Sequence, residues 1–180
     1  MTYNLKKEAE KKERLAGGHR LCAGCGAGIT VRGVLRALDP EDKAVVVNAT
    51  SCLEVSTFMY PYTAYEDSFI HSAFENAAAT AAGVETAYKV LQHKGKVKEN
   101  FKVIAFGGDG GTYDIGLQSL SGAIERNHDF VYVCYDNEAY MNTGIQRSSS
   151  TPRFADATTS PAGSKLPGKQ QNKKDLTAII

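Results

Sequence analysis

A cluster of glycines around one aspartate is the part of this chain best suited to chemistry. Gly107-Gly108-Asp109-Gly110-Gly111 follows an apolar stretch, and Asp136-Asn137 follows after a helix-length gap. Glycines at a strand end let the backbone approach a phosphate, and a carboxylate and an amide oxygen can hold a hard divalent cation against it. The spacing predicts a magnesium-diphosphate anchor. The alternative is a glycine turn in an ordinary nucleotide-type fold.

Four cysteines form the second group with chemical potential, at positions 22, 25, 52 and 134. Cys22 and Cys25 are about one turn apart, which suits a shared metal or cluster, and Cys52 can close on the same site. On spacing alone, zinc is as good an occupant as iron-sulfur, and a redox dithiol stays open. Cys134 lies within a predicted strand, where we expect a buried, small apolar side chain.

Apolar stretches supply the elements that must position these groups. We expect strands at residues 44–47, 102–106 and 129–135, and helices at residues 29–38, 75–92 and 113–126. Strands alternating with helices predict an α/β fold with a mostly parallel sheet flanked by helices. Ligands of such sheets bind beyond the carboxyl ends of the strands. The loops of Cys52, Asp109 and Asn137 each follow a strand, so we expect them to meet at one edge.

The other segments are less regular. Residues 1–16 are rich in Lys and Glu, and we expect a charged arm that is solvated or clasps a partner. Residues 53–67 are aromatic and predicted to be irregular, and residues 136–152 are predicted to form a polar loop. A helix is expected to begin near residue 173 and stops on an uncapped apolar end. We therefore expect this chain to be the N-terminal part of a longer polypeptide.

Composition restricts the class of partner. The chain has 180 residues, of which 42% are hydrophobic, enough for one domain with a real core. A net charge of +1 does not favour nucleic acid or an anionic membrane. No apolar run is long enough to span a bilayer, and the charged N-terminus is unlike a secretion signal. We expect a cytoplasmic protein that binds neither nucleic acid nor membrane, with cysteines that are not in disulfides.

Ordered motifs in this chain resemble one known family. Gly108-Asp109-Gly110 followed by Asn137 resembles the thiamine diphosphate signature. Further motifs extend the likeness over about residues 17–175, to the beta subunit of pyruvate:ferredoxin oxidoreductase and its relatives acting on other 2-oxoacids. The motifs are HRLCAGCG from His19, ATSCLEV from Ala49, PYTA from Pro61, HSAFENAAA from His71, GGDGG from Gly107 and YDNEAYMNTGIQRS from Tyr135.

The resemblance implies an enzyme that oxidatively decarboxylates a 2-oxoacid, with pyruvate favoured. It implies that the acyl group passes to coenzyme A and that two electrons pass singly through iron-sulfur clusters to ferredoxin. The implied cofactors are thiamine diphosphate, Mg²⁺ and a [4Fe-4S] cluster. The implied partners are an alpha subunit, which supplies the glutamate that activates the cofactor's aminopyrimidine, further gamma- or delta-type subunits, and ferredoxin. Residues 17–180 would form the thiamine diphosphate-binding domain, with an N-terminal cluster loop.

The family's functional residues carry over by motif. The resemblance implies that Asp109, Asn137 and the backbone carbonyl of Ala139 bind Mg²⁺. It implies that Asn142 lies near the reacting carbon as a catalytic residue. Cys22, Cys25 and Cys52 would ligate the [4Fe-4S] cluster, with the fourth ligand not in this chain. The residues implied to contact the cofactors are Cys52, Gly108, Asp109, Gly110, Gly111, Asn137, Asn142 and Thr143.

Two functions of other classes stay open. A non-redox thiamine diphosphate decarboxylase or synthase would share the diphosphate site but would have no use for Cys22, Cys25 and Cys52, so iron content separates it. A non-catalytic metal-binding assembly subunit would bind no thiamine diphosphate and would tolerate Asp109→Ala. The choice of acid, including branched-chain 2-oxoacids, depends on side-chain-pocket residues and on the partner chains.

Overall fold

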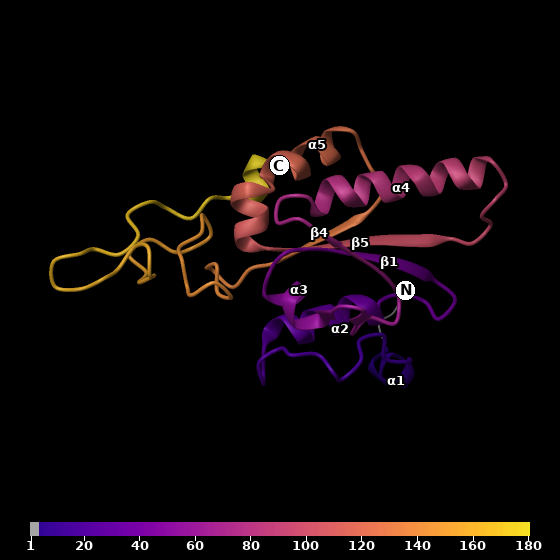
Figure 1. Ribbon diagram of the computed structural model, residues 1–180, viewed down its shortest axis with the longest axis horizontal. Coiled ribbons are helices and arrows are strands. Elements are labelled where there is room, and N and C mark those ends of the chain that lie inside the picture. The colour runs from indigo at the N-terminus through magenta and orange to yellow at the C-terminus, as the bar shows by residue number, and fades with distance from the viewer. Residues whose placement is uncertain (1–3) are drawn as a thin grey trace.

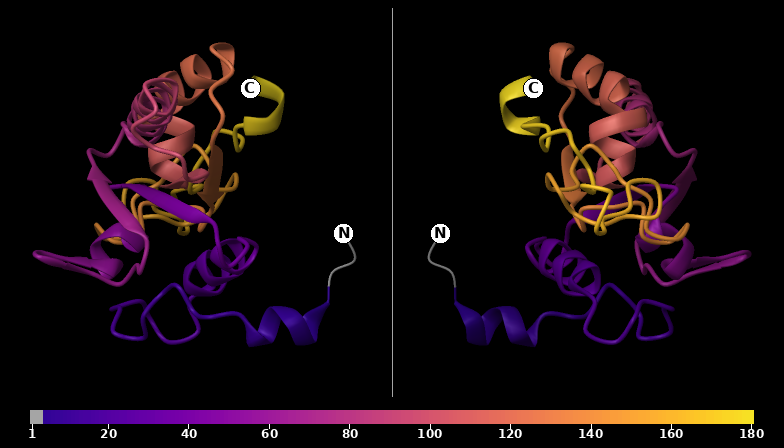
Figure 2. Two further views of the ribbon diagram at one scale, coloured as in Figure 1. Left: turned by 90° about the vertical axis from the view of Figure 1, so that its right-hand side faces the viewer. Right: turned by 90° about the vertical axis from the view of Figure 1, so that its left-hand side faces the viewer.

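The computed structural model describes residues 4–180 and contains a four-stranded parallel sheet between two layers of helices (Figure 1). The strand order is β4-β1-β5-β6, and each neighbouring pair runs parallel. Figure 2 shows α2 on one face of the sheet and α4 and α5 on the other. The predicted α/β class is confirmed. The strands are β1 Lys43–Ala49, β4 Ser68–Ser72, β5 Phe101–Gly108 and β6 Val131–Tyr135, and the covering helices are α2 Gly26–Arg36, α4 Ala77–His93 and α5 Leu117–Glu125.

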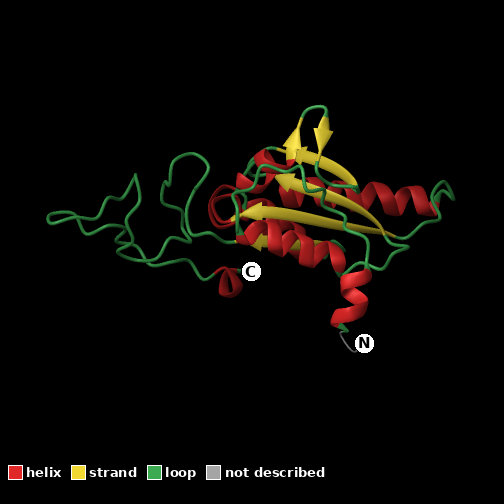
Figure 3. Cartoon of the chain, turned by 90° about the horizontal axis from the view of Figure 1, so that it is seen from below, coloured by secondary structure: helices red, strands yellow, loops and turns green. Residues whose placement is uncertain are grey.

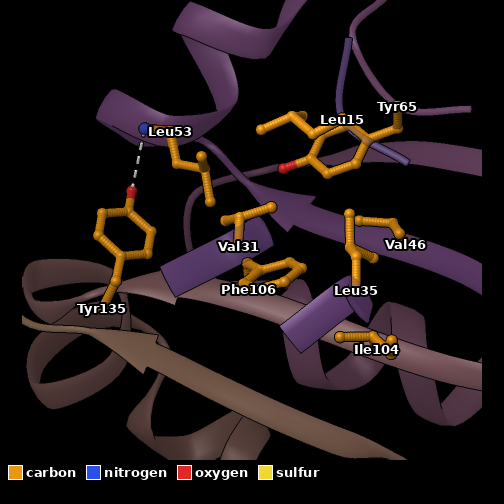
Figure 4. Close-up of a cluster of buried hydrophobic side chains, with 9 residues drawn as sticks. All are labelled: Leu15, Val31, Leu35, Val46, Leu53, Tyr65, Ile104, Phe106 and Tyr135. Carbon is orange, nitrogen blue, oxygen red and sulfur yellow. Dashed lines mark hydrogen bonds between the residues drawn. The ribbon is translucent and has the colours of Figure 1, made fainter. Parts of the chain in front are cut away.

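Alternation along β1 and β5 divides the core between the two faces. On the α2 face, side chains of the strands and of α2 pack with Leu53 and Tyr65 (Figure 4). On the other face, Val47, Val103 and Ala105 pack against Ala77 and Ala81 of α4. Successive strand residues point to opposite faces, so one apolar run serves both layers. The alanines of α4 let this helix lie close against the sheet.

The carboxyl ends of the strands share one edge of the sheet. Figure 3 shows the parallel strands pointing toward the long loop that follows β6. The loops after β1 and β5 leave the sheet at this same edge, because all four strands run in the same direction. This direction brings the motif loops to one end of the molecule.

Residues 53–67 are more regular than predicted. A short helix, α3 Cys52–Thr57, is followed by a two-stranded hairpin of β2 Phe58–Met59 and β3 Tyr62–Thr63. The Ser51 side chain caps α3 by accepting a hydrogen bond from the Glu54 backbone N–H. A serine three residues before a glutamate is the capping-box pattern, which outweighs the weak helix propensity of the Val, Ser and Thr that follow.

The helix after the glycine cluster begins earlier than predicted. A π-helix, η1 Gly110–Ile115, precedes α5, whereas the sequence predicted a start at Tyr113. The helix begins with Gly110 and Gly111, and because glycine is a poor helix former the sequence did not predict a helix there. Near the C-terminus, α6 Leu176–Ile179 is shorter than expected and is capped by the Asp175 side chain.

The N-terminal arm contacts the rest of the chain. Its helix, α1 Leu5–Glu10, buries no residue, but Lys11 Nζ donates to the carbonyls of Arg36 (2.8 Å) and Leu38 (3.1 Å). Leu15 is only 3% exposed and belongs to the core. Residues 1–3 of the expected arm lie outside the described residues. Within residues 4–180, no helix combines the length and apolarity needed to cross a membrane.

Candidate functional site

A pocket that is partly open to solvent lies where the loops after β1, β5 and β6 meet. Such edges are the usual ligand sites of parallel sheets. The pocket contains every residue implied to bind a cofactor or Mg²⁺ except two of the cluster cysteines. Its lining residues are Thr50, Ser51, Cys52, Phe74, Gly108, Asp109, Gly110, Gly111, Tyr135, Asn137, Ala139, Tyr140, Met141, Asn142 and Thr143.

The glycine cluster is packed too tightly for side chains. A Cβ at Gly110 would lie 2.2 Å from the ring of Tyr140, and one at Gly107 would lie 2.2 Å from the Tyr132 hydroxyl. The Tyr140 ring stacks on Phe74 with 5.7 Å between centroids, and its hydroxyl donates to Asp114 Oδ2 at 2.9 Å. The turn therefore presents bare backbone to the pocket, next to the start of η1, where free N–H groups favour an anion.

Three oxygen-bearing groups converge beside this turn. One terminal atom of the Asn137 amide lies 2.9 Å from both Asp109 Oδ1 and the Ala139 carbonyl oxygen. With nitrogen at that position, Asn137 donates to both. With oxygen there, three oxygens face one another without a donor, and the amide nitrogen lies 3.8 Å from Cys52 Sγ. A cluster of acceptors of this kind suits a hard cation such as Mg²⁺.

Asp109 is buried, with 2% of its surface exposed. Burial, together with the nearby Asp136 charge, raises the pKa of the Asp109 carboxyl to about 6. Burying a carboxylate is costly unless a cation or hydrogen-bond donors compensate for the lost solvation. A buried carboxylate such as Asp109 is therefore suited to bind a metal ion. Asp109 Oδ2 accepts a hydrogen bond from Ser148 Oγ at 2.5 Å, which leaves Oδ1 on the side of Asn137.

Residues 148–151 form a polar loop that the sequence analysis did not single out. Ser149 Oγ donates to Asp114, and Ser150 Oγ lies 2.6 Å from both carboxylate oxygens of Asp136. Thr151 Oγ1 donates to the Glu138 carbonyl at 2.5 Å. The run of four hydroxyl residues at 148–151 was the available signal, but hydroxyl-rich loops are common and carry little specificity.

Asn142 and Thr143 lie in the turn after Ala139. Both line the pocket, and among residues 4–180 no hydrogen bond fixes the Asn142 side chain. Thr143 Oγ1 is used inside the turn, where the Tyr140 carbonyl oxygen, at 3.3 Å, and Gln146 Oε1 are both within reach of its single proton. Asn142 thus keeps its amide available to a ligand, whereas the Thr143 hydroxyl already has partners.

The cysteines divide between the pocket and its surroundings. Cys52 lines the pocket, while Cys25 lines a neighbouring hollow that shares Tyr135 and Asn137 with it. Cys22 is exposed, and the Cys25 N–H donates to the Cys22 carbonyl. Within residues 4–180, no three Cys, His, Asp or Glu side chains are grouped as a metal site. Cys134 is partly buried in β6, and burial raises the pKa of its thiol to about 11.

The Cys52 helix is anchored to the sheet on two sides. The Leu53 N–H donates to the Tyr135 hydroxyl at 3.2 Å (Figure 4). The buried Glu54 carboxylate lies 2.8 Å from Nδ1 of His71, at the end of β4. These contacts fix the position of Cys52 relative to β6 and to the loop that follows it.

A family model described as "Thiamine pyrophosphate enzyme, C-terminal TPP binding domain" matches residues 49–180. The chain is 61% identical to pyruvate synthase subunit PorB of Thermotoga maritima, with 100% of this chain and 58% of that protein covered. It is 58% identical to PorB of Methanocaldococcus jannaschii, with 94% and 57% covered. The predicted resemblance is confirmed, and the chain spans little more than half the length of these curated relatives.

Two further proteins are similar. The chain is 44% identical to ketoisovalerate oxidoreductase subunit VorB of Pyrococcus furiosus, with 94% of this chain and 54% of that protein covered. A solved structure, 2-oxoglutarate:ferredoxin oxidoreductase from Magnetococcus marinus with 2-oxoglutarate, coenzyme A and succinyl-CoA bound, superposes with a TM-score of 0.71 at 23% identity. That superposition covers 92% of this chain and 53% of the other, and it shows a shared fold.

Proposed function

The chain belongs to the thiamine pyrophosphate enzymes, and from this membership we propose that it is the cofactor-binding part of a pyruvate:ferredoxin oxidoreductase beta subunit. The proposed reaction converts pyruvate and coenzyme A to acetyl-CoA and CO₂, releasing two electrons to ferredoxin, and it can run in reverse. The observation that carries the proposal is the convergence of Asp109, Asn137 and the Ala139 carbonyl in one pocket. The choice of pyruvate over other 2-oxoacids is supported by the similarity to proteins named pyruvate synthase subunit PorB.

The residues of the pocket fit thiamine diphosphate with Mg²⁺. Asp109, Asn137 and the Ala139 carbonyl would hold the cation, since carboxylate, amide and carbonyl oxygens are its preferred ligands. Gly108, Gly110 and Gly111 would hold the diphosphate through backbone groups, because a Cβ at these positions would meet neighbouring atoms within 3.3 Å. Cys52, Asn142 and Thr143 complete the proposed lining.

When bound, thiamine diphosphate supplies the carbanion and the electron sink that decarboxylation needs. The chain's own residues would then bind and orient the cofactor and the substrate and exclude water from them. The Tyr140 ring and Phe74 form an apolar wall, and Asn142 offers an amide for polarising a carbonyl or steadying a negative charge. Such a site needs no protein nucleophile.

We further propose that Cys22, Cys25 and Cys52 are ligands of a [4Fe-4S] cluster whose fourth ligand lies outside this chain. Cys52 supports this, because it lines the pocket in which the cofactor would bind. Cys25 supports it through the hollow that adjoins the pocket at Tyr135 and Asn137. Cluster binding would have to bring the Cys22–Cys25 turn toward Cys52.

The proposed partners follow from the same family. An alpha subunit would supply the glutamate that activates the cofactor, and gamma- or delta-type subunits would carry electrons onward to ferredoxin. The domain spans residues 17–180 in this proposal, and the location is cytoplasmic. The pocket's open side supports an active site completed by another subunit.

The test is anaerobic EPR of the purified complex, containing the full-length form of this subunit, before and after addition of pyruvate. The proposal predicts a pyruvate-dependent organic radical together with a reduced [4Fe-4S] signal, enhanced by coenzyme A. Signals that respond to another 2-oxoacid and not to pyruvate would contradict the choice of substrate. A complex with no iron signal after dithionite, containing zinc or no metal, would contradict the oxidoreductase itself.

A further inference from the structure

The hydroxyl loop at residues 148–151 lies against the three aspartates that surround the pocket turn. Ser148 contacts Asp109, Ser149 contacts Asp114, and Ser150 contacts Asp136. Consecutive residues of one short loop thus hold carboxylates that come from the end of β5, from η1 and from the end of β6. Ser148 and Ser150 are fully buried, so these hydrogen bonds are shielded from water.

Ser148 is the member of the loop that touches the proposed cation site. It donates to one oxygen of Asp109, and the other oxygen faces Asn137. A carboxylate can rotate about its Cβ–Cγ bond, and a hydrogen bond to one oxygen fixes the direction of the other. The Ser150 N–H in turn donates to Ser148 Oγ at 3.1 Å, which directs the hydroxyl proton toward Asp109.

A buried lysine holds the loop from beneath. Lys169 is 1% exposed, and within residues 4–180 no carboxylate lies within ion-pair distance of its ammonium group. Its Nζ donates to the carbonyls of Ser149 (3.3 Å) and Thr151 (2.5 Å). A buried ammonium without a counter-ion is rare, because its desolvation is costly. Its two hydrogen bonds to loop carbonyls indicate a role in fixing the loop.

The chain around Lys169 is itself fixed in place. The Lys169 N–H donates to the Ala155 carbonyl at 3.1 Å, and the Phe154 N–H donates to the Lys169 carbonyl at 2.6 Å. Gly168 has a φ of +73°, and a Cβ there would lie 2.5 Å from the Phe154 carbonyl oxygen. This close pairing directs Lys169 inward, under the hydroxyl loop.

We propose that Ser148 is a positioning residue that orients the Asp109 carboxylate toward the cation, and that Lys169 holds Ser148 in place by clamping residues 148–151. This inference rests on the proposed thiamine diphosphate and Mg²⁺ site and extends it to residues that touch neither ligand. Removal of the Ser148 hydroxyl frees the carboxylate to rotate and weakens Mg²⁺. Removal of the Lys169 charge loosens the loop, so that Ser148 no longer holds Asp109 and Mg²⁺ binding is weakened indirectly.

The experiment measures cofactor binding, not turnover. The full-length subunit in its complex is stripped of cofactor with EDTA, and bound thiamine diphosphate is measured by equilibrium dialysis across a Mg²⁺ titration. Ser148→Ala is expected to raise the half-saturating Mg²⁺ concentration 10- to 100-fold, the usual effect of losing a partner of a metal ligand. Lys169→Met, which keeps most of the side-chain volume, is expected to raise it in the same direction.

Controls separate positioning from folding. Ser164→Ala removes an exposed hydroxyl from the same long loop and should leave the titration unchanged. Ser148→Cys replaces the hydroxyl by a thiol, which is only a weak donor, and serves if Ser148→Ala does not fold. Melting temperature is recorded for each variant, because a purely structural role would lower it without shifting Mg²⁺ dependence.

The outcomes are distinguishable. Wild-type complex that shows no Mg²⁺-dependent binding of thiamine diphosphate would overturn the proposed function, and the inference with it. Wild-type binding with an unshifted titration in folded Ser148→Ala or Ser148→Cys would overturn the role of Ser148 alone. If the half-saturating Mg²⁺ concentration shifts in Ser148→Ala but not in Lys169→Met, the role of Lys169 as a clamp is overturned and the role of Ser148 stands.

Discussion

At the scale of single residues, the two oxygens of Asp109 have different tasks. Oδ2 accepts from Ser148, and Oδ1 faces Asn137, close to the Ala139 carbonyl. The carboxylate loses solvation in this buried arrangement, which raises the pKa of Asp109 to about 6. A site that is unfavourable without its cation is one that the cation stabilises.

Asp109→Asn tests this division of tasks. The amide can still accept from Ser148, but it carries no charge, so binding of thiamine diphosphate with Mg²⁺ should fall at least about 100-fold. The cofactor-free protein should be no less stable than wild type, because a buried charge has been removed. Dialysis and a thermal melt in EDTA measure the two effects. A variant that melts earlier but binds normally would refute the account of Asp109.

Gly110 and Gly83 form a matched pair of glycines. A Cβ at Gly110 would lie 2.2 Å from the Tyr140 ring, whereas one at Gly83, exposed on α4, would meet nothing within 4 Å. Gly110→Ala should destabilise the protein by about 1–3 kcal/mol through overpacking and weaken cofactor binding. Gly83→Ala should stabilise it by about 0.5–1 kcal/mol and leave binding unchanged. Chemical denaturation measures both, and equal effects of the two changes would contradict the packing argument.

At the scale of elements, the sequence was sufficient for the covering helices and for three of the four strands of the sheet, but β4 was not among the expected strands. The predicted strands at 44–47, 102–106 and 129–135 lie within or overlap β1, β5 and β6, because buried parallel strands are continuous apolar runs. The Ser51 capping box was overlooked because its helix is short. A polar loop was predicted at residues 136–152, but the contacts of its hydroxyl residues could not be, since Asp109, Asp114 and Asp136 are brought together only by the fold.

The family resemblance predicted more of the site residues than residue types and spacing did. Composition and spacing suggested Asp109 and Asn137, and only the family resemblance added Ala139, Asn142 and Thr143. The structure places all five in one pocket. Their binding roles stay predictions, as does cluster ligation by Cys22, Cys25 and Cys52. Lys169 gave no signal, because a lysine in a polar loop is expected to be exposed.

Glu85 ties α4 to the segment before β6, and it gives the fold a pH dependence. Its carboxylate accepts from the Asp129 N–H at 3.2 Å, lies 3.0 Å from His128 Nδ1 and pairs with Lys89. Despite burial, which raises it, these hydrogen bonds lower the pKa of Glu85 to about 2. The unfolded-state pKa is about 4.3, so the ionised form is favoured by folding. This contribution is complete above about pH 5 and is lost as pH falls toward 2.

Glu85→Gln should therefore lower the free energy of unfolding by about 1–3 kcal/mol at pH 7. The difference from wild type should shrink as pH falls through 4 toward 2, because wild-type Glu85 then becomes protonated. Urea denaturation at a series of pH values measures it. A difference that stays constant across this range would show that the Glu85 charge does not contribute.

At the scale of the whole molecule, the long loop after β6 extends from the carboxyl edge of the sheet (Figure 3), and its first residues line the pocket. The proposed function needs a glutamate from another subunit, and the described residues place no Glu side chain in the lining. The full-length beta subunit on its own is expected to show no pyruvate-dependent reduction of ferredoxin. Mixing with the partner subunits should restore it. Turnover by the isolated subunit would refute the shared active site.

The measurement that tests the central claim most directly is a crystal structure of the full-length subunit in its complex with thiamine diphosphate and Mn²⁺ in place of Mg²⁺. The account predicts an anomalous peak bounded by Asp109 Oδ1, Asn137 Oδ1 and the Ala139 carbonyl oxygen. It also predicts the diphosphate against Gly108, Gly110 and Gly111, with Ser148 still donating to Asp109. A manganese peak elsewhere, or Asn137 still donating its amide to Asp109 in the loaded site, would contradict it.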